Sequence, residues 1–372
     1  SSFDLTNIAS SAPGANLSHM MDGAHAASID LTAVGQGADA DLSYMTANCT
    51  SLESVTYMNV GTGAGANASY MMGGCTSLTD VTMTKVASGT NANLTGMFQG
   101  CSVFDAGTPK VTYSLTDVGT GTGAKLTSLV AGAFASELDP GSAFKMERTT
   151  ARTRSGDMAG AFDAGENTLS HMPSFDLSGL SDAPSGAPSL ARLFRNQAGI
   201  SWVAAARYGR SGYVPGMPVS ENAMQPSPDV ALEGGGIALP DGWDASSVTS
   251  YDAMFVGCER LAVAYMPGMN QGSRPTMDAL FEGCRELTYV GLTAPTDDAG
   301  TPDYGLVTSV LSMRRAFAGC AKLASVDLRG IGTSYLVTGT DITSSTGGME
   351  DMFEGATALQ DASTTSRIVI GP

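Results

Sequence analysis

The sequence is poor in charge and in the residue types that most often carry chemistry. Charged residues make up 15% of its 372 residues, and it has only 3 His and 2 Trp. An average soluble domain is about 25% charged. Acidic residues outnumber basic ones by 36 to 19, which gives a formal net charge of −17. A chain of this charge repels phosphate backbones, so we expect no nucleic-acid partner.

Long apolar runs are also missing. No stretch approaches the roughly 18 consecutive apolar residues that a membrane span requires, so we expect no membrane insertion. The apolar content of 42% is nevertheless too high for general disorder. The chain starts at Ser1 without a charged and then apolar leader, which we interpret as a processed or trimmed product whose export signal is already lost.

What the sequence has instead is an internal repeat, and its cysteines reveal it. Cys49, Cys75 and Cys101 are 26 residues apart, as are Cys258 and Cys284. The cysteines follow similar segments, such as MFVGC and LFEGC, and other units have a different residue in the same place. We call this position the anchor. The anchors are Ala24, Cys49, Cys75, Cys101, Ala133, Gly165, Gln197, Cys258, Cys284, Cys320 and Ala356.

A second pattern surrounds the anchor. Leu recurs three positions after it, Val six after it and an apolar residue eight after it, and the last two positions share the parity of one strand face. This pattern predicts short strands at Ser54–Met58, Asp80–Met83 and Ser325–Leu328. An apolar pair and a Gly precede the anchor, which predicts a tight helical or 3₁₀ turn where Gly reverses the chain.

One such unit cannot bury its apolar edge alone, but stacked units share a continuous core. We therefore predict a mainly β fold: a right-handed leucine-rich-repeat or β-solenoid of about eleven stacked units with short helical turns. Within one continuous solenoid we expect regular repeats at 1–135, longer irregular repeats at 136–206, a Pro/Gly-rich excursion at 207–245 and C-terminal repeats at 246–372. The excursion either conceals a degenerate unit or is a loop with little regular structure, and its Pro and Gly content favours the loop.

The M-F-x-G-C-x-x-L-x-x-V-x-L unit resembles the leucine-rich repeats of bacterial surface proteins, the BspA-like class. The likeness covers most of the chain and is strongest over Leu42–Asp105 and Tyr251–Leu328. The resemblance implies an extracellular or cell-surface location and a role in adhesion or protein–protein contact. Units of 32 and 36 residues exceed the usual length in this family, which leaves room for extra loops or an extra strand.

Two interpretations of the cysteines stay open. Their even number and the expected export suggest disulfides. Each cluster holds three cysteines, however, and Ala or Gly fills the same place in other units, which favours a ladder of buried thiols. The predicted structural ladder is Cys49, Cys75, Cys101, Cys258, Cys284 and Cys320. Zinc is not expected because no CxxC pair occurs.

No motif for catalysis or for a metal stands out. HExxH and GxSxG are absent, and the three histidines do not form a closely spaced ligand set. Asp252, Asp278 and Glu350 share the position six before the anchor, which predicts a solvated acidic row, with weak calcium binding as the alternative. We expect no catalytic residue, no metal site and no cofactor.

Four Asn-x-Ser/Thr sequons are candidate glycosylation sites, at Asn16, Asn48, Asn67 and Asn93. All but Asn48 lie eight residues before an anchor, so the repeat itself generates them. They matter only if the chain is made in a cell that glycosylates asparagine.

The leading hypothesis is a non-enzymatic extracellular repeat protein that acts as a cell-surface adhesion or structural fibre subunit through its extended repeat surface. The alternative is a carbohydrate- or receptor-binding module, because large aromatic side chains suited to sugar stacking gather near the excursion. These candidate recognition residues are Trp202, Tyr208, Tyr213 and Trp243.

The expected partners are proteins, above all further copies of the same chain, with glycans as a further candidate. The first residues, Ser2–Asn7, match the strand pattern without a preceding anchor, so the chain opens in the middle of a unit. An open strand edge is a template for pairing with another chain. We therefore expect a homo-oligomer formed by head-to-tail or lateral packing.

Overall fold

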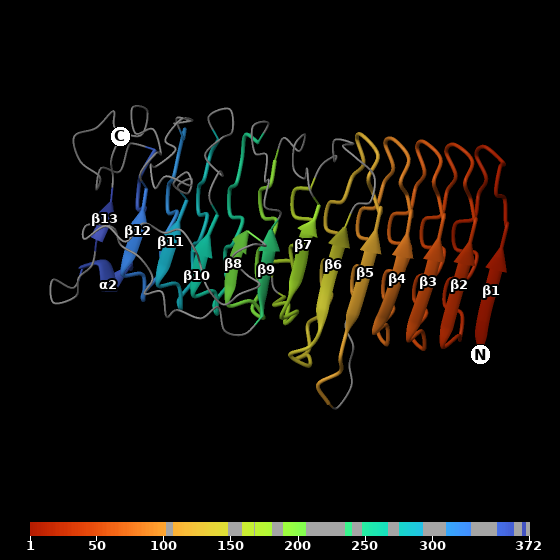
Figure 1. Cartoon of the computed structure of the whole chain (residues 1–372), viewed down its shortest axis with the longest axis horizontal. Helices are drawn as coiled ribbons and strands as arrows, with labels where there is room; N and C mark the ends of the chain where they lie inside the picture. Colours follow the sequence, from red (N-terminus) through yellow and green to blue (C-terminus); the bar gives the residue numbers. More distant parts are fainter. Residues whose placement is uncertain are drawn as a thin grey trace, which may run out of the picture.

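In the computed structural model the chain winds into a row of stacked coils, and each coil gives one strand to a common sheet (Figure 1). The sheet has thirteen strands, and every neighbouring pair is parallel. The predicted β-solenoid is therefore confirmed. The structure describes residues 1–101, 107–147, 158–166, 168–180, 189–205, 235–239, 248–266, 275–292, 310–328, 348–360 and 367–369.

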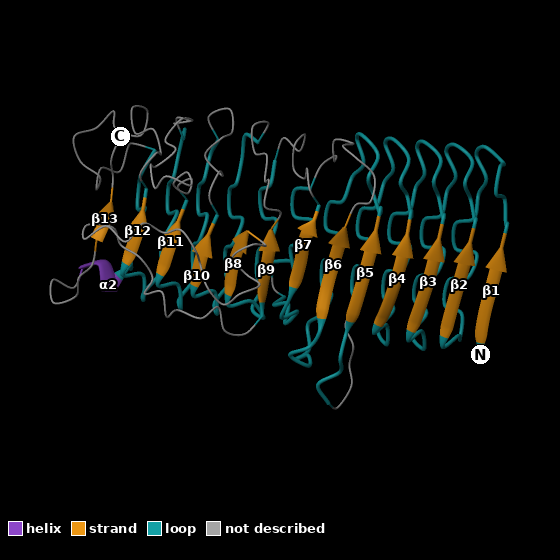
Figure 2. Cartoon of the chain, in the orientation of Figure 1, coloured by secondary structure: helices purple, strands orange, loops and turns teal. Residues whose placement is uncertain are grey.

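The strands are short throughout, and among the described residues turns, loops and one short helix make up the rest of the coils (Figure 2). Their bounds are β1 Ser2–Thr6, β2 Ser28–Thr32, β3 Ser54–Met58, β4 Asp80–Thr84, β5 Thr112–Thr116, β6 Ala143–Glu147, β7 Phe175–Gly179, β8 Trp202–Ala205, β9 Gly236–Leu239, β10 Val263–Tyr265, β11 Tyr289–Gly291, β12 Ser325–Asp327 and β13 Arg367–Val369. The short helix α2 spans Thr357–Gln360. Across the described ranges no helix has the length and apolar character to cross a bilayer.

The predicted strands match β3, β4 and β12 closely. In β3, Val55 and Tyr57 face the core and are buried, while Thr56 and Met58 point outward and are exposed. This alternation is the one that the apolar positions after the anchor predict. From β1 to β6 each strand pairs with the next without a shift in register, so equivalent residues form straight rows across the sheet.

The segment before the anchor differs from the expected helical or 3₁₀ turn. It is a run of β-turns, in which the Met45 amide donates to Leu42 O at 3.2 Å and the Ala47 amide to Tyr44 O at 3.1 Å. The amides that alternate with these donate to the next coil instead, Tyr44 to Ser69 O at 3.1 Å and Thr46 to Met71 O at 2.9 Å. A helix would keep these amides within its own coil, so the pairing between coils selects the β-turns.

Glycine reverses the chain just before the anchor, as expected. Gly74, Gly100 and Gly283 have φ values of 75°, 72° and 78° there, a region that a residue without Cβ adopts at little cost. At this position Gly100 lies directly over the backbone of Gly74, so the coils can stack closely.

One apolar core runs through the inside of all coils, and its composition changes along the chain. From Phe162 onward a phenylalanine lies three residues before each anchor, and these rings form a continuous stack with centroids 5.2 to 5.8 Å apart and planes within 13° of one another. The stack runs through Phe162, Phe194, Phe255, Phe281, Phe317 and Phe353.

Part of the predicted excursion is a strand. β9 lies between β7 and β8 in the sheet, although β8 precedes it in sequence. Ile237 pairs with Phe175 of β7 on one side and with Val203 of β8 on the other. The interpretation as an irregular loop is therefore wrong for 236–239, while 206–234 and 240–247 lie outside the described residues. The other proposed boundaries along the chain stay predictions.

Candidate recognition surface on the stacked coils

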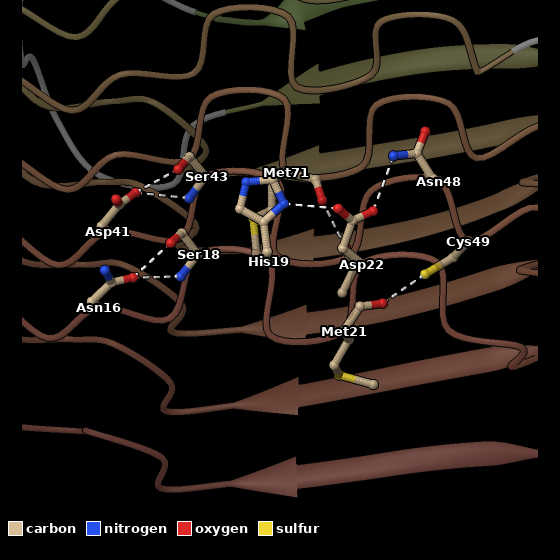
Figure 3. A network of polar contacts seen from close by, with 11 residues as sticks. Asn16, Ser18, His19, Met21, Asp22, Asp41, Ser43, Asn48, Cys49 and Met71 are labelled. Carbon is tan, nitrogen blue, oxygen red and sulfur yellow. Dashed lines mark hydrogen bonds and ion pairs between the residues drawn. The ribbon is translucent and has the colours of Figure 1, made fainter.

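The six anchor cysteines are free thiols buried in the core. Each Sγ donates to a carbonyl of the preceding coil, three residues before that coil's own anchor. Cys49 reaches Met21 O at 3.2 Å (Figure 3), and Cys320 reaches Phe281 O at 3.1 Å. Cys75, Cys101, Cys258 and Cys284 repeat this contact at 3.1 to 3.2 Å. The thiols therefore link successive coils.

The surroundings of these thiols disfavour thiolate chemistry. Burial raises the pKa of Cys320 to about 12 and holds the pKa of Cys284 well above its usual range. The pKa of Cys49 is also raised, first by its hydrogen bond with Cys75 and then by burial. A thiol is a nucleophile only as its thiolate, so Cys49, Cys284 and Cys320 stay protonated and unreactive near neutral pH.

The least typical anchor, Gln197, keeps the hydrogen bond of the cysteines. Its Nε2 donates at 2.5 Å to Phe162 O, which lies three residues before the preceding anchor. Its Oε1 is buried and has no hydrogen-bond partner among the residues that the structure describes. Beside it, the largely buried Arg195 forms a two-pronged ion pair with Asp163, whose shortest contact is 2.8 Å. A polar link between coils therefore replaces the thiols in the middle of the chain.

Three of the four sequon asparagines, Asn16, Asn67 and Asn93, belong to a row of side-chain amides eight residues before the anchors. The Asn67 Nδ2 donates to Asp41 Oδ1 at 3.1 Å, and the Asn93 Nδ2 donates to Asn67 Oδ1 at 3.2 Å. Each Oδ1 also accepts from the Ser or Thr two residues on, as Asp41 does from Ser43 Oγ at 2.7 Å (Figure 3). The Asn-x-Ser/Thr pattern thus has a structural use at these positions. Asn67 and Asn93 are half-buried, whereas Asn16 and Asn48 are exposed.

A row of rings, exposed at His19 and Tyr44 and half-buried at Tyr70, lies on the turn segments of the first coils. His19 stacks on Tyr44 with centroids 4.9 Å apart, and Tyr44 stacks on Tyr70 at 5.1 Å. We call these three residues the aromatic row. Their stacked faces cover one another, and Tyr70 lies over Gly96, where a Cβ would come within 2.5 Å of the ring. Both faces of the Tyr44 ring are therefore covered, by His19 on one side and by Tyr70 on the other.

A polar chain flanks the aromatic row. His19 Nδ1 lies 2.7 Å from Asp22 Oδ2, and the Asn48 Nδ2 donates to Asp22 Oδ1 at 3.0 Å (Figure 3). The hydrogen bond with His19 is the main cause that lowers the pKa of Asp22. Sequence reasoning missed this cluster, although His19, Tyr44 and Tyr70 share the position five before the anchor. That shared position was the available signal.

The predicted acidic row serves as a set of acceptors for the neighbouring coil. Asp252 Oδ1 accepts from the Asp278 amide at 2.9 Å, and Asp278 Oδ1 accepts from the Arg314 amide at 2.8 Å. Glu350 pairs with the Arg314 side chain at 2.5 Å. Nowhere in the described ranges do three His, Cys, Asp or Glu side chains gather into a set that could hold a metal ion.

Among the predicted recognition residues, only Trp202 lies in a described part of the chain. Its indole packs over Gly236 of β9, where a Cβ would come within 2.2 Å of the ring. Trp202 borders a small apolar cluster on the outward side of the sheet, opposite the main core. The buried members of this cluster are Ala204, Val263, Tyr265 and Tyr289. Tyr208, Tyr213 and Trp243 lie outside the described residues.

No protein-family model and no curated protein matches the chain. Among solved structures, the chain is similar to a leucine-rich cell surface protein from Faecalibacterium prausnitzii A2-165, with 13% sequence identity and a TM-score of 0.28. The match covers 100% of this chain and 90% of that one. The solenoid fold itself rests on the thirteen parallel strands described above.

Proposed function

We propose that this chain is a non-enzymatic extracellular or cell-surface repeat protein that acts in adhesion or as a structural subunit. The observation that carries this proposal is the single thirteen-stranded sheet, which turns a short repeat into a long and regular surface. On such a surface many weak contacts act together, so useful avidity does not require a deep pocket.

The use of the polar side chains supports this proposal. The anchor thiols, the Asn67 row and the acidic row at Asp252 all bond to the neighbouring coil, so each contributes to the stack. None of these groups is arranged as a nucleophile beside a base. These polar groups thus stabilise the stack of coils rather than form a reaction centre.

We further propose that copies associate through the edge of β1. In the first coil Leu5 and Leu17 are only partly buried, whereas their equivalents one coil later, Leu31 and Leu42, are fully buried. A strand that pairs with the outer edge of β1 would cover these side chains and would hydrogen-bond to the backbone groups of β1 on that edge. The geometry suits head-to-tail growth of the sheet.

The test is the mass of the purified chain over a wide concentration range, measured by light scattering and accompanied by negative-stain microscopy. We expect oligomers or filaments that grow with concentration. Phe3→Lys, which places a charge at the partly exposed Phe3 on the core side of β1, should abolish association. Thr6→Lys on the outward side of the same strand is the matched control and should associate normally. A strictly monomeric native chain at high concentration contradicts the association.

The alternative function, carbohydrate or receptor binding by the 202–243 aromatic region, has one supporting observation. Trp202 keeps part of its surface accessible at the border of the outward apolar cluster. Binding of a soluble glycan that disappears in Trp202→Ala, with Phe3→Lys unaffected, would favour this alternative over a purely structural role.

A further inference from the structure

Two tyrosines of the aromatic row face each other on neighbouring coils. The rings of Tyr44 and Tyr70 are stacked with centroids 5.1 Å apart and 10° between their planes. Both residues lie five positions before their anchors, and both have a φ of 53°, so the two side chains leave the backbone in the same way. The two phenol rings therefore form a matched pair, although 26 residues separate them in sequence.

The backbone holds the two rings in this arrangement. The Tyr44 amide donates to Ser69 O at 3.1 Å, which fixes Tyr44 against the residue just before Tyr70. Three residues before the two tyrosines, Asp41 and Asn67 form a parallel bridge between the same two coils. Because these contacts persist in the folded chain, the two phenols meet within one molecule and do not depend on collision.

No other two neighbouring units have a tyrosine at this position. His19 precedes Tyr44 in the row, and Gly96 follows Tyr70. The remaining units have Ser128, Gly160, Arg192, Ala253, Ala279, Arg315 and Asp351 there. Tyr44 is exposed and Tyr70 is half-buried, so a soluble oxidant can reach the pair. The fully buried tyrosines of the core are Tyr57, Tyr113 and Tyr251.

Two phenols held at this distance can be joined once each has lost an electron and a proton. The resulting phenoxyl radical shares its unpaired electron with Cε1 and Cε2, the ring carbons next to the one that bears the oxygen. Two neighbouring radicals couple through a bond between such carbons. From the closeness and the access of this pair, we propose that Tyr44 and Tyr70 are an oxidative cross-linking site, which hydrogen peroxide and a haem peroxidase convert into dityrosine.

The reaction balances on these atoms. Through the peroxidase, hydrogen peroxide takes one electron and one proton from each phenol and becomes two water molecules. A bond then forms between one Cε of Tyr44 and one Cε of Tyr70. Each bonded carbon releases its hydrogen as a proton and each phenol oxygen takes up a proton, so the chain loses two hydrogen atoms in total.

The new bond fastens two coils covalently and also closes the loop between them in the unfolded chain, which restricts that state. This modification goes beyond the adhesive or structural role proposed above and does not depend on association through β1.

The purified full chain at low concentration, treated with hydrogen peroxide and a haem peroxidase, tests this proposal. We expect dityrosine fluorescence in a product of monomeric size. Tyr44 is the only tyrosine in residues 1–53, and Glu53 is the only glutamate between Tyr44 and Tyr70. Cleavage after glutamate should therefore leave peptide 1–53 joined to peptide 54–137, at a combined mass lower by two hydrogen atoms. Fragmentation should locate the bond at Tyr70.

Three variants separate this pair from the other tyrosines. Tyr44→Phe and Tyr70→Phe each keep a ring in the stack but remove one phenol oxygen, so each should abolish the joined peptides. Tyr57→Phe is the matched control, because it removes a buried tyrosine from peptide 54–137, and it should keep them. Circular dichroism and the unfolding midpoint verify that each variant is folded. Tyr44→Phe, at the exposed position, decides the matter if Tyr70→Phe fails to fold.

The unfolded chain tests whether the stack is responsible. Unfolding in urea before treatment should lower the yield of joined peptides at least about tenfold, because the rings no longer have a fixed approach. Free tyrosine in the same urea verifies that the peroxidase is active. Equal yields from the folded and unfolded chains overturn the proposal. A folded native chain that gives no joined peptides overturns it too, and so does a cross-linked product found only at twice the mass of the chain.

Discussion

The N-terminal and C-terminal coils share one backbone plan but are joined on the outside by different interactions. Around β3 and β4, amides and hydroxyls link the coils, as in the Asn67–Asp41 contact of 3.1 Å. Around β11 and β12, ion pairs link them: Arg315 contacts Glu282 at 2.7 Å and Glu354 at 2.6 Å. The repeat thus fixes the buried positions and the backbone pairing, while the outer rows vary as long as neighbours in a row are complementary.

The interiors differ as well. Three residues before the anchor, the C-terminal coils all have a stacked phenylalanine, whereas the N-terminal coils have Thr46, Met72, Phe98 and Val130. The buried Thr46 hydroxyl donates to Met71 O at 2.9 Å and accepts from the Tyr57 hydroxyl at 3.0 Å. A polar residue is tolerated at this core position because both of its hydrogen bonds are satisfied.

The largest expected effect breaks the phenylalanine stack. Phe281→Ala should lower the free energy of unfolding by about 3–5 kcal/mol, because the cavity removes ring contacts with both neighbouring coils. Met72→Ala at the same position of an N-terminal coil should cost less, within a range of about 2–5 kcal/mol, because the Met side chain is smaller than the ring. Urea denaturation of each variant measures both. The exposed Leu311 provides the control, since Leu311→Ala should stay within about 0.5 kcal/mol of the native chain. A larger loss for Met72 than for Phe281 would contradict the comparison.

The next effect concerns the anchor thiols at alkaline pH. The pKa of Cys320 is about 12 in the folded chain and 9.0 in the reference state, so the folded state favours the protonated thiol. Its contribution to stability is complete below pH 9 and is lost as the pH rises towards 12. Between pH 9 and pH 12 the free energy of unfolding should therefore fall less in Cys320→Ala than in the native chain. Thermal unfolding at several pH values measures this difference. The burial of the thiols would be contradicted if a thiol reagent at pH 8 reacted as fast with the native chain as with the unfolded chain.

A smaller effect is expected in the N-terminal amide row. Asn67→Ala removes the bond to Asp41 and leaves Asn93 without its acceptor, which should cost about 1 kcal/mol. Because Asn67 is neutral, the loss should be nearly the same in low and in high salt. Chemical denaturation at both ionic strengths measures it, and Thr90→Ala, at an exposed position of the same turn region, is the control.

The smallest effect is expected in the C-terminal ion pairs. Arg315→Gln should cost about 0.2–1 kcal/mol at low salt, because its side chain and those of Glu282 and Glu354 are partly solvated. About 1 M salt should remove most of this difference, since screening then acts over about 3 Å. The two salt series together define the contrast between the halves. A salt-dependent loss at Asn67 and a salt-independent one at Arg315 would reverse it.

The sequence predicted the coils well because their signals are local and repeated. The residue types at Cys49, Val55 and Tyr57 recur in other units at the same sequence spacing. That spacing sets which strand positions face the core and where the anchor lies. The β-turns before the anchor could not be separated from a helical turn, since both place apolar residues on one side. Only the alternating pairing of amides such as that of Tyr44 with the next coil distinguishes them.

The surface features were harder to predict, for two different physical reasons. His19 and Tyr44 were visible at one repeat position, but their stacking depends on ring orientation, which a sequence does not specify. The position of β9 between β7 and β8 depends on a crossing of distant segments, and no local pattern reports it. Trp202 illustrates the consequence, because its indole packs over a glycine of that later strand.

The position of β9 also bears on the order in which the protein assembles during synthesis. From β1 to β7 each new strand can dock onto its predecessor as soon as the ribosome releases it. β8 cannot join in this way, because the strand that separates it from β7 is made afterwards. The N-terminal coils can therefore mature while the chain is still growing, whereas β8 must wait for β9 before it can join the sheet.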